Sequence, residues 1–280
     1  MELSLITHDE CALARIVPSQ TKHGGVGPTK GIYCFVIDVS GSMHSPAEVT
    51  TDDGDKISHG WSQLDIGKHS TNAFVSSLDA DDYVSIVTYS DGARVHLGWT
   101  LCDGAGKEAA MRAIDAMRPE RSTNLMAGLT TGFDQMGALP NGLPLEQYTV
   151  NLIVTTDGMP SAQVRRRRRA RRSTPARAQP FNPPCPPTTQ WSPARGRAGY
   201  APLVRALSNK LVSRRGPASR PTVTSIGLGY KLDSELLEHF SDEFLHLPDP
   251  GSVGPFMVRL PNRTEVRLVC FLILTTDLFR

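Results

Sequence analysis

The stretch Ile32-Tyr33-Cys34-Phe35-Val36-Ile37-Asp38-Val39-Ser40-Gly41-Ser42 decides the fold and points to a function. Its apolar first half is typical of a buried strand, which we predict over residues 32–39. Where that strand ends, Asp38 supplies a carboxylate, and Ser40 and Ser42 supply two hydroxyls. Alternate residues of such a turn can aim their oxygens at one point, and Gly41 permits the tight backbone this requires. The stretch therefore predicts a binding site for a hard cation.

Two later segments contain the other ligands expected around such a cation. Thr123, within Ser122-Thr123-Asn124, adds a third hydroxyl, and the apolar run that begins at Leu152 ends in a second carboxylate, Asp157. Oxygen ligands without sulfur or imidazole favour Mg²⁺, with Mn²⁺ or Ca²⁺ as alternatives, over Zn²⁺. Because hydroxyls are neutral, the ion would keep much of its charge and a coordination position for water or an incoming anion.

Strand and helix patterns alternate along the chain. We predict strands at 32–39, 83–89, 150–155 and 222–227, and helices at 56–78, 107–117, 125–136, 200–212 and 234–240. A short antiparallel edge strand is expected at 93–97, after the Asp91-Gly92 turn. This order predicts a doubly wound α/β fold, with a mostly parallel central sheet and helices on both faces. In such sheets ligands bind at the carboxyl ends of the strands, where Asp38 and Asp157 fall.

The positive charge is concentrated in one segment. Residues 165–198 contain ten arginines and no acid, so that removing them from the net charge of +2 leaves the rest of the chain at −8. We predict that this Arg- and Pro-rich segment is a disordered, solvated insert, in preference to a nuclear-import or nucleic-acid tail. Translated non-coding sequence is a further hypothesis, for this insert and for residues 260–280. We do not expect nucleic acid as a partner, because only this segment could attract it.

The cysteines and the hydropathy of the chain indicate the cellular compartment in which we expect the protein. The five cysteines are odd in number and include no CxxC pair, which argues against a disulfide framework and against a thiolate zinc site. The first ten residues lack the features of a secretory signal, and the longest apolar stretch, 266–274, is too short to span a bilayer. We therefore expect a cytoplasmic protein without a membrane span.

At the five candidate ligands the chain resembles the von Willebrand factor A domain. That family has a metal-ion-dependent adhesion site with the pattern Asp-x-Ser-x-Ser, then Thr, then Asp in successive loops, which is matched by Asp38, Ser40, Ser42, Thr123 and Asp157. Supporting segments are 82–90, 122–125, 156–160 and 225–229, and the resemblance runs from about residue 32 to 257. We expect an N-terminal extension or peripheral strand at 1–30, the domain at 31–258 interrupted by the insert, and an irregular tail at 259–280.

The resemblance implies a non-enzymatic, Mg²⁺-dependent module in which an Asp or Glu of a partner protein completes the coordination of the ion. It also implies that Asp38, Ser40 and Ser42 face the metal, and that Thr123 and Asp157 bind it directly or through water. Segments 228–237 and 248–254 look most like the intracellular members, including those joined to Hint or ubiquitin-ligase modules. One departure is that the insert begins a few residues after Asp157, where it could cover or misplace the site.

Two other classes of function stay open. A metal-assisted phosphohydrolase could use Asp38 as its nucleophile, but the chain lacks a second aspartate two residues on and a placed lysine. His44 is better interpreted as a rim residue than as a catalytic base, because no nucleophile and orienting acid accompany it. Nucleic-acid association through residues 165–172 ranks last.

Overall fold

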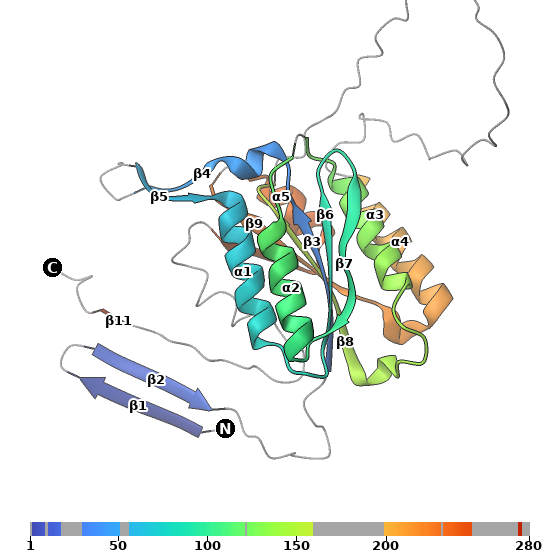
Figure 1. Ribbon diagram of the computed structural model, residues 1–280, viewed down its shortest axis with the longest axis horizontal. Coiled ribbons are helices and arrows are strands. Elements are labelled where there is room, and N and C mark those ends of the chain that lie inside the picture. The colour runs from blue at the N-terminus through green and yellow to red at the C-terminus, as the bar shows by residue number, and fades with distance from the viewer. Residues whose placement is uncertain are drawn as a thin grey trace, which may run out of the picture.

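The computed structural model describes residues 2–8, 11–17, 30–50, 56–120, 122–158, 199–230, 232–247 and 274–275. A six-stranded sheet with the order β10-β9-β8-β3-β6-β7 forms the centre of the structure (Figure 1). All neighbouring strands are parallel except β6 and β7. The strands are β3 (Lys30–Asp38), β6 (Tyr83–Tyr89), β7 (Ala93–Leu101), β8 (Tyr148–Thr156), β9 (Thr222–Leu228) and β10 (Glu243–Leu247).

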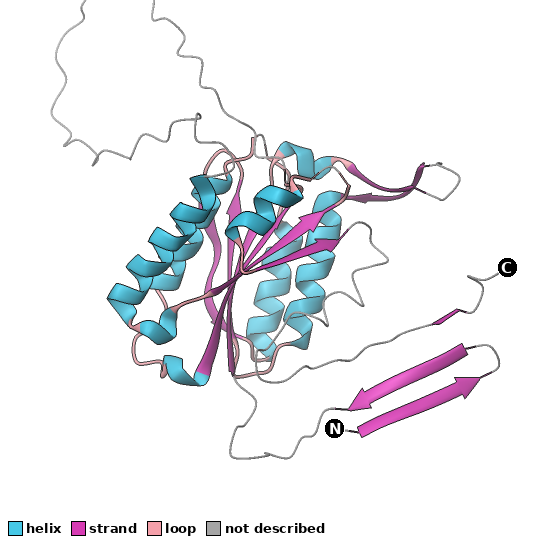
Figure 2. Cartoon of the chain, turned by 180° about the vertical axis from the view of Figure 1, so that it is seen from behind, coloured by secondary structure: helices cyan, strands magenta, loops and turns pink. Residues whose placement is uncertain are grey.

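Helices cover both faces of this sheet. Figures 1 and 2 show α1 and α2 on one side and α3 and α4 on the other, and the core residues of α5 join those of α3 and α4. The helices are α1 (Gln63–Ser77), α2 (Gly104–Ala116), α3 (Leu125–Gly137), α4 (Tyr200–Arg215) and α5 (Ser234–Phe240), with short 3₁₀ turns η1 (Gly41–His44), η2 (Leu145–Gln147) and η5 (Pro217–Ser219).

The central strand β3 explains why the sheet is covered twice. Tyr33, Phe35 and Ile37 pack into the core beneath α1 and α2, whereas Cys34 and Val36 pack into the core beneath α3 and α4. A strand that is apolar on both faces is stable only when both faces are buried. The doubly wound, mostly parallel α/β fold predicted from the sequence is therefore confirmed.

The predicted helix at 56–78 is wrong in its first part. Residues Lys56–Ser62 form strand β5, which pairs antiparallel with β4 (Pro46–Thr50), and α1 begins only at Gln63. Gly60 has a φ of 78°, which a helix does not contain. Ser62 then caps the helix: its hydroxyl accepts from the backbone N–H of Asp65 at 3.2 Å, and the Asp65 carboxylate accepts from the N–H of Ser62 at 2.9 Å.

Smaller differences concern the ends of elements. Helix α2 begins three residues before the predicted position because Asp103 caps it, with its Oδ1 accepting from Gly106 N at 2.7 Å. Strand β7 is longer than predicted, and strand β10 was not predicted. A second sheet, with the order β1-β2-β11, contains β1 (Glu2–His8), β2 (Cys11–Val17) and β11 (Leu274–Thr275).

The predicted insert at 165–198 lies outside the described residues, as does most of the predicted tail at 259–280. Within the described parts of the chain, no helix has both the length and the apolar character needed to cross a membrane.

Two glycines let α3 approach the sheet closely. A Cβ at Gly132 would lie 2.7 Å from Val36 Cγ2 and 3.0 Å from Leu152 Cδ1, and a Cβ at Gly128 would lie 2.7 Å from the Tyr89 ring. Real Cβ atoms do not come this close to such neighbours. The helix therefore contacts β3, β6 and β8 at a distance that only glycine allows.

We expect Gly132→Ala to destabilise the protein by about 1–3 kcal/mol, because overpacking outweighs the helix propensity gained. Urea-induced unfolding followed by circular dichroism measures this. Gly137→Ala in the same helix is the matched control, since its Cβ would make only ordinary contacts, with Arg214 Nη1 at 3.5 Å and Leu211 Cδ1 at 4.0 Å. Equal stability of the two variants would contradict the close-packing account.

Candidate metal centre

Asp38 is the last residue of β3, and its side chain is fully buried. Its Oδ1 accepts from the backbone N–H of Ser40 at 2.8 Å, and its Oδ2 accepts from the Thr156 hydroxyl at 2.8 Å. These bonds hold the carboxylate in one orientation, between the end of its own strand and the end of the neighbouring strand β8.

Ser40 and Ser42 continue from that strand end into η1. Their hydroxyl oxygens are 3.0 Å apart, so the structure brings these two predicted ligands together. Ser40 is buried, whereas Ser42 is exposed. Met43 anchors the turn, since its side chain is buried and its N–H donates to the carbonyl of Ser40 at 3.1 Å. Ser40 therefore lies on the buried side of the site, near Asp38, and Ser42 lies at the protein surface.

Asp157 follows β8, which runs parallel to β3 and pairs with it up to Thr155 opposite Ile37. Burial is the main cause of a raised pKa of Asp38, and the charge on Asp157, which lies near enough to act on it, adds to the rise. The turn then closes through Gly158, whose N–H donates to the Thr156 hydroxyl at 3.0 Å and whose carbonyl accepts from Asp233 N at 3.3 Å.

Thr123 is buried in the loop that precedes α3. Bonds on both sides of it tie this loop to the sheet: Glu120 N donates to the Val39 carbonyl at 2.5 Å, and Asn124 N donates to the Ser90 carbonyl at 2.6 Å. Asn124 also caps α3, with its side chain accepting from Ala127 N at 3.1 Å. The loop of Thr123 thus lies against the ends of β3 and β6.

Glu120 forms part of the rim of this region. Its carboxylate accepts from the Ser90 hydroxyl and forms an ion pair with Arg94 at 2.7 Å. The hydrogen bond from Ser90, and then Arg94, hold the pKa of Glu120 below its usual range. These contacts fix the loop of Thr123 by a second route.

Burial dominates the electrostatics of the site. It raises the pKa of Asp38 to about 6, although hydrogen bonds from Ser40 and Thr156 oppose the shift. The Tyr89 hydroxyl is buried nearby, and its pKa is raised well above its usual value, first by burial and then by the charge on Asp38. No described basic side chain forms an ion pair with Asp38. The ionised carboxylate is therefore costly to bury without a cation.

The donor set fits a hard divalent cation. The five predicted ligands offer two carboxylates and three hydroxyls, and no sulfur or imidazole, which suits Mg²⁺. Within the described ranges, no three His, Cys, Asp or Glu side chains cluster as a metal site, so hydroxyls would be essential to any cation bound here.

Sequence reasoning missed Thr156, Tyr89 and Glu120. The only available signal for Thr156 was its position directly before Asp157 at the end of an apolar strand. Tyr89 was included in a predicted strand, and Asp38 pairs with it in the register of β3 and β6. Glu120 gave no signal in the sequence, because its partners Ser90 and Arg94 lie about 30 residues away.

Comparison with known proteins identifies a family and a fold. The family model described as "von Willebrand factor type A domain" matches residues 33–159. Among solved structures, the SpaC pilus adhesin of Lactobacillus rhamnosus GG is 13% identical with a TM-score of 0.53, covering 91% of this chain and 33% of that one. A D319A mutant of the PilB minor pilin of Streptococcus sanguinis is 15% identical with a TM-score of 0.50, covering 82% and 60%.

A third structure, proximal thread matrix protein 1 from the mussel byssus, is described with a zinc-occupied MIDAS motif. It is 17% identical with a TM-score of 0.47, covering 80% of this chain and 45% of its own. The chain thus spans less than two thirds of the length of each of these structures. No curated protein matches the chain.

Proposed function

Residues 33–159 belong to the von Willebrand factor type A domain family, and we propose that the chain is a Mg²⁺-dependent, non-enzymatic module that binds an Asp or Glu carboxylate of a partner protein. One observation carries the proposal: the fully buried carboxylate of Asp38 lies beside a second carboxylate and two adjoining hydroxyls, and no described basic side chain neutralises it. A divalent cation would supply the missing charge.

Asp38, Ser40, Ser42, Thr123 and Asp157 are the residues proposed to hold the ion. The ion would supply a positive centre on which an anionic side chain of the partner can bind. The chain's own residues orient that centre: Thr156 fixes the carboxylate of Asp38, and Glu120 and Asn124 fix the loop of Thr123. The exposure of Ser42 supports access from solvent.

The non-enzymatic part of the proposal is supported by the surroundings of Asp38. No described Lys or Arg side chain forms an ion pair with it, so the placed lysine that a phosphohydrolase would use is not found beside it. Hydrolysis of a generic phosphate ester in the presence of Mg²⁺, abolished by Asp38→Asn, would favour the phosphohydrolase alternative instead.

We also propose a cytoplasmic location and a relationship to the intracellular members of the family, including those linked to Hint or ubiquitin-ligase modules. The sequence resemblance of residues 228–237 supports this. Among the described residues, Cys34 and Cys102 are buried free thiols, which agrees with a reducing compartment.

Calorimetric titration of the full chain tests the metal site. We expect Mg²⁺ to bind the protein, and Asp38→Ala to weaken binding more than tenfold because it removes a charged ligand. Asp134→Ala is the matched control, since Asp134 is an exposed acid on α3. Failure of the protein to bind Mg²⁺ or Mn²⁺, or equal binding by the Asp38→Ala variant, would refute the proposal. Partner proteins captured with Mg²⁺ but lost in EDTA would identify the ligand.

A further inference from the structure

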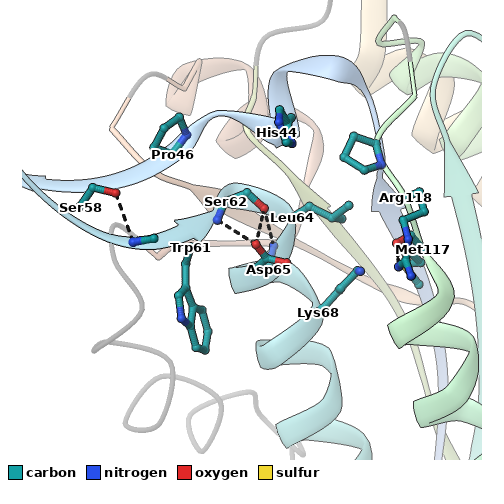
Figure 3. Close-up of a pocket in the computed structure, with 12 residues that line it drawn as sticks. His44, Pro46, Ser58, Trp61, Ser62, Leu64, Asp65, Lys68, Met117 and Arg118 are labelled. Carbon is teal, nitrogen blue, oxygen red and sulfur yellow. Dashed lines mark hydrogen bonds between the residues drawn. The ribbon is translucent and has the colours of Figure 1, made fainter.

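A cavity of about 510 Å³ lies between the β4–β5 hairpin, the N-terminal end of α1 and the C-terminal end of α2 (Figure 3). Two of its walls continue into the candidate metal centre. His44 belongs to η1, which also carries Ser42, and Pro119 precedes the residue whose N–H is bonded to Val39. The cavity therefore adjoins segments that carry the candidate metal ligands.

Lys68 and Arg118 place two positive charges on one wall. Lys68 Nζ donates to the Asp115 carbonyl at 3.3 Å, and Arg118 Nη1 donates to the carbonyls of Asp115 and Met117, both at 2.7 Å. The shared carbonyl of Asp115 keeps the two cationic groups close together. Burial, and then the charge on Arg118, lower the pKa of Lys68. In the described part of the chain, neither group forms an ion pair with a carboxylate.

Two acids, Asp65 and Asp115, act on the charge of Lys68, and each carboxylate already accepts other hydrogen bonds. Asp115 Oδ1 accepts from Asn72 Nδ2 at 3.1 Å. Asp65 is the only acid among the residues that the structure shows lining the cavity, and its Oδ2 accepts from Ser62 N at 2.9 Å and from Ser62 Oγ at 2.7 Å. It is held by the cap of α1, at the positive end of the helix. The cations of the cavity are thus left available to an anion from outside.

We propose that this cavity receives a second acidic side chain of the partner, from an acidic stretch whose neighbouring Asp or Glu binds the metal ion, and that Lys68 and Arg118 bind its carboxylate. The guanidinium of Arg118 has N–H groups beyond Nη1 with which to bind a carboxylate. Trp61, which is 37% exposed, and Pro46 offer apolar surface to the stem of that side chain. The proposal rests on the proposed function and specifies the partner as an acidic peptide segment.

The test compares two labelled peptides, pentaglutamate and Gly-Gly-Glu-Gly-Gly, binding to the full chain at 150 mM NaCl in Mg²⁺ and in EDTA. Binding that persists in EDTA includes any contribution of the arginines at 165–198, so only the Mg²⁺-dependent part is compared. The pocket variant is Lys68→Gln/Arg118→Gln. The charge-matched control is Arg205→Gln/Lys210→Gln, which removes two exposed cations from α4 on the opposite face.

We expect wild type to bind pentaglutamate more tightly than the single-glutamate peptide. The pocket variant should lose about tenfold of the pentaglutamate affinity, the cost of two charge-assisted contacts, and keep its affinity for Gly-Gly-Glu-Gly-Gly and for Mg²⁺. The control variant should change neither. Lys68→Arg/Arg118→Lys keeps both charges but not the guanidinium at 118, and should retain more pentaglutamate affinity than the pocket variant, which separates loss of charge from loss of folding.

Pentaglutamate affinity that is equal in the pocket and control variants would overturn the proposal, as would equal binding of the two peptides by wild type. An oligothymidylate that binds in EDTA through Lys68 and Arg118 would also overturn it, since the cavity would then be a general polyanion site. These outcomes leave the metal-dependent function intact, whereas absence of Mg²⁺ binding in wild type would refute that function itself.

Discussion

Asp38→Asn is expected to make the metal-free protein more stable at neutral pH and to abolish its stabilisation by Mg²⁺. Burial raises the pKa of the Asp38 carboxyl to about 6 in the folded state, against about 3.9 in an unfolded chain. The folded state therefore binds the proton of Asp38 more tightly than the unfolded chain does. The stability that this protonation contributes is complete below pH 4 and is lost as the pH rises through 6. A difference of two pKa units corresponds to roughly 3 kcal/mol of stability, which wild type loses when Asp38 ionises. Asn cannot ionise, so the variant does not lose this stability.

Urea unfolding in EDTA at pH 4.5 and at pH 7.5 measures this effect. The variant should gain about 2 kcal/mol of stability relative to wild type between the two values, which is less than the full 3 kcal/mol because the carboxyl of the unfolded chain is already mostly ionised at pH 4.5. In Mg²⁺ at 100 times its Kd, wild type alone should recover about 2.7 kcal/mol. A difference between the two proteins that is the same at both pH values would contradict burial of an ionised carboxylate as the cause.

Gly158→Ala is expected to cost about 2–4 kcal/mol of stability and to weaken Mg²⁺ binding at least tenfold. Gly158 has a φ of 77°, a conformation that costs an L-residue about 1–2 kcal/mol. A Cβ there would also lie 2.8 Å from Leu232 Cβ and 2.9 Å from Asp233 N. Since that backbone cannot give way as a flexible side chain would, the turn must move, and Asp157 moves with it.

Gly142→Ala is the matched control for this variant. Gly142 has a similar φ of 85°, but nothing lies within 4 Å of its hypothetical Cβ. It should lose only the conformational part, about 1–2 kcal/mol, and bind Mg²⁺ as wild type does. Urea unfolding and calorimetry of the two variants separate strain from crowding. Equal metal affinity in both would show that the turn at Gly158 does not position a ligand.

The fold could be predicted because its strands are apolar on both faces. In β3, β6 and β8 nearly every residue is buried, and apolar and β-branched residues predominate in each strand although Ser85, Thr88 and Asn151 are polar. The start of α1 could not be read from periodicity, since Ile57 and Trp61 fit a helical pattern equally well. The helix begins at Gln63 because Gly60 has a positive φ and Ser62 caps the first turn. Strand β10 is short and only its last residue is buried, which left little pattern to detect.

The site was predictable to the extent that it depends on strand ends. Asp38 and Asp157 end adjacent parallel strands, and parallel strands bring their carboxyl ends to one edge. The position of the loop around Thr123 depends on bonds to Val39 and Ser90, and no local pattern encodes bonds between segments so distant in sequence. The roles of the five residues as metal ligands stay a prediction, which the Mg²⁺ titrations would test.

The place of β3 in the strand order has a consequence for how the domain would open. Strand β3 is flanked by β8 and β6, whereas β10 and β7 lie at the two margins of the sheet. Fraying of a marginal strand leaves the central three hydrogen-bonded, so partial opening of this kind would not release an ion held at their tips. Escape of the ion would then require either movement of the loops alone or cooperative loss of the whole sheet.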